Sequence, residues 1–295
     1  MSDFENRDLL DSANMKDEYA LWLLENYPSM WKHSLSDCRS DDNSAALWML
    51  YSSAYLFRTA GVRWSVDPVY SEWSLENPIS VADDLDFLDL VLLTHEHADH
   101  CDLPLISRLC RRKGLTLVVP SHLEERVLGN AEIVNCDFRV VSPGDIITVK
   151  GLKATAFDSL HFDENPQPGD PVGCEETGWL VEVDDKRLLF PGDIRNYSLR
   201  SDLPDFGAID FLFAHLWLGR RKAMTFTDSD LNSFAKFVAS FRAQNVFLAH
   251  LCEISRVPED YWTLKHAELA ADRISTISPG AETTPLVTGR RINLW

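Results

Sequence analysis

The stretch that decides the fold is THEHADH at residues 94–100, which directly follows the apolar run DLVLL at residues 89–93. An apolar run of this length is typical of a strand buried on both faces, so the histidines come at the end of a buried strand. In the tight loop that follows, His95 and His97 can face one cation while Asp99 and His100 face a second. Such a mixture of imidazoles and a carboxylate suits zinc, iron or manganese.

Two other interpretations of this motif fail. A zinc-protease helix needs histidines at its first and fifth positions, and Asp99 occupies the fifth. A solvated turn with chance histidines is a poor explanation, because the pattern arises at random in about one such chain per thousand. A strand that leads into four candidate ligands therefore predicts a metal site.

The order of elements around the motif occurs twice along the chain. A strand over residues 47–58, a turn and a returning strand lead to Asp67, and a second strand, turn and strand over residues 179–190 lead to Asp193. Two later apolar runs end in histidines, at residues 215 and 250, as the first run ends before His95. Two strand-rich halves with helices between the strands predict a layered α/β or α+β sandwich.

Helices are expected at residues 103–112, 121–128, 228–242 and 259–274. A further helix at residues 17–27 is expected to end at Pro28, within a helical N-terminal extension of residues 1–44. We expect this extension to cover a main domain of residues 45–295. Residues 163–175, rich in proline, glycine and acidic residues, are expected to form an exposed loop.

The chain has 295 residues, with 28 basic and 46 acidic residues and a formal net charge of −18. This balance argues against nucleic acid or an anionic membrane as the main partner, because both require a basic surface. The acidic start of the sequence does not resemble a secretory signal, and the six scattered cysteines suggest reduced thiols. We therefore expect a cytoplasmic protein that acts on a small molecule and that can form a homo-oligomer.

Five motifs, in this order, resemble those of metallo-β-lactamase-fold hydrolases over residues 46–255. They are SVDP at residues 65–68, THEHADH at 94–100, DSLH at 158–161, LFPGD at 189–193 and FLAH at 247–250. The resemblance implies an αββα four-layer sandwich of the α+β class, made of two similar halves. It also implies a metal-dependent hydrolase with two divalent metal ions, most simply zinc, with manganese or iron as alternatives.

The resemblance also assigns roles to individual residues. The first metal would be bound by His95, His97 and His161. The second would be bound by Asp99, His100 and His250. Asp193 would bridge the two metals, and Asp67 would orient the motif loop.

The implied mechanism uses a hydroxide held by the two metals to cleave an ester, lactone or phosphoester. Asp99 is the expected general acid and base, and His215 is a candidate to contact the substrate. Arg195, Arg220 and Arg221 could neutralise an anionic substrate. The segments SPGDIITVK at residues 142–150 and MT at 224–225 resemble those of the branch that contains L-ascorbate-6-phosphate lactonase and related hydrolases.

Two alternative functions remain open at this point. One is a nuclease of the same fold that acts on RNA, which the acidic charge disfavours. The other is a protein that keeps the metal cluster for binding or sensing without catalysis, which the complete ligand set disfavours.

Overall fold

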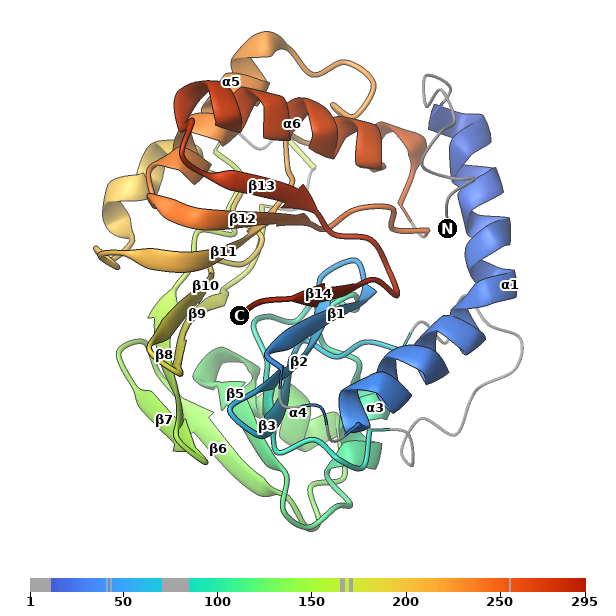
Figure 1. Ribbon diagram of the computed structural model, residues 1–295, viewed down its shortest axis with the longest axis vertical. Coiled ribbons are helices and arrows are strands. Elements are labelled where there is room, and N and C mark those ends of the chain that lie inside the picture. Colours follow the sequence, from blue (N-terminus) through green and yellow to red (C-terminus); the bar gives the residue numbers. More distant parts are fainter. Residues whose placement is uncertain are drawn as a thin grey trace.

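The computed structural model describes residues 12–40, 42, 44–70, 85–164, 168–169, 172–254 and 256–295. Two seven-stranded sheets pack face to face, with helices on both outer sides (Figure 1). Helices α5 (Asp228–Ala239) and α6 (Leu264–Ile277) cover the second sheet. Helices α1 (Ser12–Arg39), α3 (Leu103–Leu109) and α4 (Glu124–Asn130) lie on the side of the first sheet. The predicted αββα four-layer sandwich is confirmed.

Each half of the chain builds one sheet, apart from the last strand. The first sheet has the strand order β14-β1-β2-β3-β4-β5-β6. Its strands are β1 (Ala46–Tyr51), β2 (Ala54–Thr59), β3 (Val62–Val66), β4 (Leu90–Leu92), β5 (Thr116–Pro120), β6 (Asp137–Val141) and β14 (Arg291–Asn293).

The second sheet has the order β13-β12-β11-β10-β9-β8-β7. Its strands are β7 (Ile146–Val149), β8 (Leu152–Asp158), β9 (Thr177–Val183), β10 (Lys186–Phe190), β11 (Ile209–His215), β12 (Ala243–Ala249) and β13 (Glu282–Pro285).

The predicted repeat is present in the strand pairing. In the first sheet, β2 and β3 form an antiparallel hairpin, and β3, β4, β5 and β6 then pair in parallel. In the second sheet, β9 and β10 form the hairpin, and β10, β11, β12 and β13 pair in parallel. The carboxyl ends of the parallel strands in a sheet point in one direction, so each half presents a row of strand ends.

The space between the sheets is filled by aromatic side chains. Phe57 and Trp64 stack with ring centroids 4.1 Å apart, and Phe190 and Phe213 stack at 4.3 Å. All four side chains are buried. Since offset aromatic pairs add to the free energy gained by burial, this layer fixes the two sheets against each other.

Two local predictions are wrong. The strand predicted over residues 47–58 is two strands, because the chain turns at Ser52, whose φ is 47°. Both strands are completely buried, and so are Ser52 and Ser53 between them, so the turn lacks the exposed polar residues or glycine that would mark it in the sequence. The helix predicted to end at Pro28 continues to Arg39.

The buried face of α1 explains why this helix passes its proline. Tyr19, Leu23, Tyr27, Trp31 and Leu35 recur every four residues, and all five are buried in one core cluster. Burial of this continuous face offsets the backbone hydrogen bond lost at the proline, which costs about 3 kcal/mol.

The predicted division of the chain is only partly described. The boundary at residue 44 stays a prediction. Residues 1–11 of the predicted extension lie outside the described residues, as do residues 165–167 and 170–171 of the predicted loop. Across the described part of the chain, no helix is long and apolar enough to span a membrane.

We expect Trp31→Ala to lower the free energy of unfolding by about 3–5 kcal/mol, because the side chain is 1 % exposed and contacts Tyr70 edge to face. Urea denaturation measures this change. The matched control on the same helix is Leu21→Ala, whose side chain is 63 % exposed and should change stability by no more than about 0.5 kcal/mol. Equal effects of the two substitutions would show that α1 does not stabilise the sheet.

Candidate metal centre

Strands of both sheets end at the same edge of the sandwich, and polar side chains follow these ends. Asp67 follows β3, and His95 comes shortly after β4 in the first sheet. In the second sheet Asp193 follows β10, His215 ends β11 and His250 follows β12. All five side chains are buried. Each comes from a different strand, so the site forms only when the two sheets pack together.

Two of these strand ends have a left-handed backbone. The φ angle is 45° at Asp67 and 63° at His250, a conformation that costs a side-chain-bearing residue about 1 kcal/mol or more. Backbone hydrogen bonds hold both residues: Asp67 donates to Leu92 at 3.0 Å and His250 donates to Ser52 at 3.0 Å. The strained backbone turns both side chains toward the site.

Three histidines and a cysteine form the first group of candidate ligands. Atoms of His95, His97, His161 and Cys174 lie within 4.8 Å of one another. The Nε2 atom of His95 is 3.1 Å from Nδ1 of His97. Cys174 Sγ lies 3.6 Å from Nδ1 of His161, so the thiol is beside the nitrogen that points away from Asp193.

Asp99, His100 and His250 form the second group, again within 4.8 Å of one another. The Oδ2 atom of Asp99 lies 3.6 Å from Nε2 of His250 and 3.9 Å from Nε2 of His100. The motif at residues 94–100 thus contributes side chains to both groups of candidate ligands.

The carboxylate of Asp193 lies between the two groups. Its Oδ2 atom is 3.9 Å from Nε2 of His95 and 4.0 Å from Nε2 of His161. The same oxygen is 3.5 Å from Nε2 of His100 and 3.3 Å from Nε2 of His250. One oxygen therefore faces four imidazole nitrogens, two from each group.

The site fits metal ions because two of its inward-facing atoms lack partners. Among the described residues, Asp193 Oδ2 and His161 Nε2 are buried without a hydrogen-bond partner. An unsatisfied buried polar atom costs about 1–3 kcal/mol, and a cation between these atoms would satisfy both. Neutral imidazoles and carboxylates are ligands of zinc, iron and manganese.

Carboxylates hold the outer nitrogens of two histidines. Asp67 Oδ2 lies 2.7 Å from Nδ1 of His100, and Asp67 Oδ1 accepts from the backbone of Thr94 at 2.8 Å. Glu176 Oε1 lies 2.9 Å from Nδ1 of His95. Such contacts orient an imidazole and leave its other nitrogen for a metal. Asp67 thus has the geometry expected of it, and Glu176 is an additional support that the sequence does not reveal.

Gly192 makes the Glu176 support possible. A Cβ atom at this position would lie 2.4 Å from the Glu176 carboxyl carbon. Without that atom, the Glu176 carboxylate accepts from the backbone N–H of Asp193 at 2.9 and 3.0 Å. Glu176 therefore fixes a ligand histidine and the candidate bridging residue at the same time.

His215 lies in the centre, with both ring nitrogens engaged. Its Nδ1 is 2.5 Å from Asp193 Oδ1, and its Nε2 is 2.7 Å from the hydroxyl of Tyr55. The ring also stacks on His250 with an interplanar angle of 11°. These contacts hold Asp193 in position. His215 also lines a small cleft with Asp193 and His250, and its contact with a substrate stays a prediction.

Of the three arginines predicted to bind substrate, two lie together in the structure and the third does not. Arg195 and Arg220 both approach Asp163, at 3.7 and 2.6 Å, and both guanidinium groups lie over the ring of Trp217. Arg195 also lines a small cleft with Asp193, His215, Trp217 and His250. Arg221 bonds through its backbone N–H to Asp260 and is not among the residues that line this cleft.

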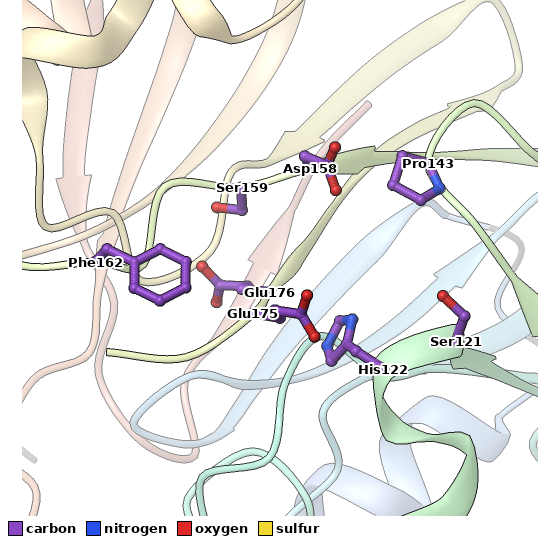
Figure 2. Close-up of a pocket in the computed structure, with 8 residues that line it drawn as sticks. All are labelled: Ser121, His122, Pro143, Asp158, Ser159, Phe162, Glu175 and Glu176. Carbon is purple, nitrogen blue, oxygen red and sulfur yellow. The ribbon is translucent and has the colours of Figure 1, made fainter. Parts of the chain in front are cut away.

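A larger cavity of about 460 Å³ lies on the other side of Glu176 (Figure 2). The carboxylates of Asp158, Glu175 and Glu176 border it, together with His122 and the exposed ring of Phe162. Its charge is opposite to that of the Arg195 side. An anionic group is therefore favoured beside Arg195 and disfavoured in this cavity.

Burial and the central carboxylate divide the histidines into two sets. Burial lowers the pKa of His161 to about 3 and holds the pKa of His95 well below its ordinary value. Burial acts in the same direction on His100 and His250, but the negative charge of Asp193 outweighs it and raises the pKa of both. The first group is thus neutral at pH 7, as metal binding requires.

A model of the beta-lactamase superfamily domain matches residues 63–251. The chain belongs to this superfamily. A metal-dependent hydrolase from Methanopyrus kandleri is 30 % identical over 148 residues, which cover 48 % of this chain and 58 % of that protein. The 4-amino-L-phenylalanyl-[CmlP-peptidyl-carrier-protein] 3-hydroxylase of Streptomyces venezuelae is 30 % identical over 152 residues, or 48 % of this chain and 27 % of that protein.

Among solved structures, CmlA, a diiron β-hydroxylase from Streptomyces venezuelae, has the same fold with a TM-score of 0.61 and 17 % identity. That comparison covers 87 % of this chain and 55 % of the other. The chain thus matches less than two thirds of the length of these relatives. Membership of the superfamily, together with the His and Asp clusters, supports an enzyme that requires metal.

Several residues of the site carry no sequence signal. Glu176 and Cys174 fall at the end of a segment that composition marks only as a loop, and Tyr55 is one of many buried aromatics. Glu253 and Arg256, beside His250, belong to no recognisable motif. The pairing of β9 with β10 brings Glu176 near Asp193, and the hydrogen bond from Thr177 to Thr94 between the two halves brings it near His95, so the sequence does not predict these contacts.

The depressed histidine pKa values predict how the metal-free protein responds to acid. Since His161 has a pKa of about 3 when folded and 6.5 as its ordinary value, the unfolded chain binds the extra proton between these pH values. Stability should fall as the pH decreases from 6.5, with His161 alone contributing a loss of about 2 kcal/mol at pH 5. His100 and His250 have raised pKa values and stay protonated in the folded state, so they oppose this loss as their unfolded forms gain a proton, mainly above pH 6.5 and only slightly below it.

Urea unfolding of the metal-free protein at pH 6.5 and at pH 5 measures this dependence. A free energy of unfolding that stays constant or rises toward pH 5 would contradict it.

Proposed function

We propose that the protein is a metal-dependent hydrolase that uses two divalent metal ions to cleave an ester, lactone or phosphoester bond of a small anionic molecule. The observation that carries the proposal is the position of Asp193 Oδ2, buried, without a partner and facing two histidines of each group. A carboxylate oxygen in this position suits a ligand shared by two cations.

The two groups would hold the two metals. His95, His97 and His161 would bind the first ion, and Asp99, His100 and His250 the second. Two such ions lower the pKa of a bound water and polarise a carbonyl or phosphoryl oxygen. Zinc fits these ligands best, and manganese and iron also accept them.

The remaining residues would orient these groups and handle the proton. Glu176 and Asp67 keep His95 and His100 in fixed orientations through contacts of 2.9 and 2.7 Å. Asp99 is the candidate to pass a proton to the leaving oxygen, because its side chain is 16 % exposed while Asp193 is 4 % exposed. A proton can reach solvent from Asp99 more readily than from the buried Asp193.

Arg195 and Arg220 support an anionic substrate. Both guanidinium groups lie over Trp217, and Arg195 lines the cleft that also contains Asp193 and His250. The resemblance of residues 142–150 and 224–225 to L-ascorbate-6-phosphate lactonase and its relatives would make a phosphorylated lactone one member of this class. A small molecule in the cytoplasm remains the expected substrate, and a nuclease would instead need RNA affinity that falls steeply with salt.

We expect His97→Ala and Asp193→Ala each to lower hydrolysis by at least about a thousandfold and to reduce bound metal, because each removes a ligand. Purified protein would be analysed for metal and assayed with chromogenic esters, lactones and phosphodiesters. The matched control is His33→Ala, an exposed histidine of α1, which should leave both readouts unchanged. Full hydrolysis by metal-free protein would overturn the proposed mechanism.

Arg195→Gln should raise KM for an anionic ester about ten- to hundredfold, because a charge-assisted hydrogen bond contributes about 1.5–3 kcal/mol. KM for a neutral ester should change little, and kcat should be nearly constant for both substrates. Arg111→Gln, an exposed arginine paired with Glu132, is the control. Equal increases in KM for the anionic and neutral esters would exclude Arg195 as an anion-binding residue.

An oxidative function is the second candidate, favoured by the similarity to the Streptomyces venezuelae hydroxylase. Iron in the purified protein together with oxygen consumption would support it. Zinc with hydrolysis in the substrate panel would support the first candidate.

A further inference from the structure

Arg256 contacts two atoms that the second metal would need. One of its terminal guanidinium nitrogens lies 3.1 Å from Asp99 Oδ2 and 3.4 Å from His250 Nε2. The side chain is 26 % exposed, so the guanidinium group lies at the solvent side of the second group of ligands. A positive charge is therefore already present where the second divalent cation would bind.

The chemistry of these contacts makes them incompatible with a bound metal. An imidazole nitrogen has a single lone pair, so His250 Nε2 cannot accept a hydrogen bond and bind a metal at once. A guanidinium group keeps its charge at every pH that a protein survives, and it repels a nearby dication. The second metal must therefore displace Arg256 from His250 and reduce its contact with Asp99.

Glu253 provides a place for the displaced guanidinium group. Its Oε2 atom accepts from Nε of Arg256 at 2.6 Å. Its other oxygen, Oε1, is buried and has no hydrogen-bond partner among the described residues, and the whole side chain is 3 % exposed. A small rotation of the guanidinium group toward Glu253 can satisfy that oxygen and keep the ion pair.

The first group of candidate ligands has no contact equivalent to that of Arg256 with the second group. Within the described ranges, no arginine or lysine forms an ion pair or hydrogen bond with His95, His97 or His161. Arg195, the arginine that lines the cleft beside Asp193, pairs with Asp163 at 3.7 Å. The two metal positions therefore differ in the charge that surrounds them.

We propose that Arg256 competes with the second metal ion. The protein then binds one divalent ion tightly at His95, His97 and His161, and a second more weakly at Asp99, His100 and His250. Glu253 receives the guanidinium group when the second ion binds. The inference rests on the two-metal centre of the proposed function and does not depend on the reaction.

The test is a zinc titration of the full chain after removal of metal, in competition with a chromogenic chelator and without substrate. Wild-type protein should bind one zinc ion tightly and a second more weakly. In Arg256→Met the second zinc should bind on the order of tenfold more tightly, because a unit charge near a dication has been removed. Arg256→Lys keeps the charge and should keep the second site weak.

A variant of the second site identifies which ion is which. Asp99→Ala should still bind one zinc with the tight affinity of the wild type, since its loss affects only the second group. Two equal affinities in the wild type, or a second zinc that binds Arg256→Met no more tightly, would overturn the inference. Loss of the tight zinc in Asp99→Ala would overturn it as well.

A second variant keeps the test decisive if Arg256→Met does not fold, which thermal unfolding of the metal-free protein would reveal. Glu253→Gln removes the negative charge that would stabilise the displaced guanidinium group, so the second zinc should bind at least several-fold more weakly while the first is unchanged. An unchanged second affinity in this variant would contradict the inference. Because no substrate is present, a failure of hydrolysis does not affect either result.

Discussion

A single buried carboxylate, that of Asp193, is the group around which the site is arranged. One of its oxygens faces histidines of both ligand groups and has no hydrogen-bond partner, while the other is 2.5 Å from His215. A charged group in this environment is unfavourable unless cations or hydrogen bonds compensate it. Histidines supply that compensation. Nε2 of His100 and of His250 lie 3.5 and 3.3 Å from one oxygen, and His215, held in place by Tyr55, contacts the other.

The packing of the two sheets against each other brings the candidate ligands together. His95, His97, Asp99 and His100 come from the first half of the chain, and His161, Asp193 and His250 from the second. Neither half contains a complete ligand group with its bridge. The aromatic layer between the sheets, with Phe57, Trp64, Phe190 and Phe213 in contact, therefore determines how the two sets of ligands meet. Packing energy far from the chemistry sets the distances at the centre.

Acidic and basic side chains lie in different places around the candidate metal centre. The chain carries a formal charge of −18, and carboxylates line the cavity beside Glu176. The cations that approach the centre lie elsewhere: Arg195 and Arg220 over Trp217, and Arg256 beside Asp99. An anion that approaches the metals meets attraction on one side and repulsion on the other. Of these cations, only Arg256 is in contact with one of the two groups of candidate ligands, through Asp99 and His250.

The sequence alone determined the class of fold and the identity of most of the candidate ligands, because both depend on local patterns. A buried strand that runs into THEHADH, and a strand, turn and strand repeat that ends each time in an aspartate, are visible without coordinates. The sequence also misled at the Ser52 turn, where both flanking strands are buried, and along α1 beyond Pro28, where the buried face continues past the proline.

Tertiary structure decided the contacts between residues distant in the chain. Glu176 reaches His95, Tyr55 reaches His215 and Arg256 reaches Asp99 across separations of 81, 160 and 157 residues. No local pattern encodes these pairs, since each depends on which strands are neighbours and on how the sheets pack. The sequence therefore specifies which residues can bind metal, and the packing of the two sheets specifies how each one is held and which charge stands beside it.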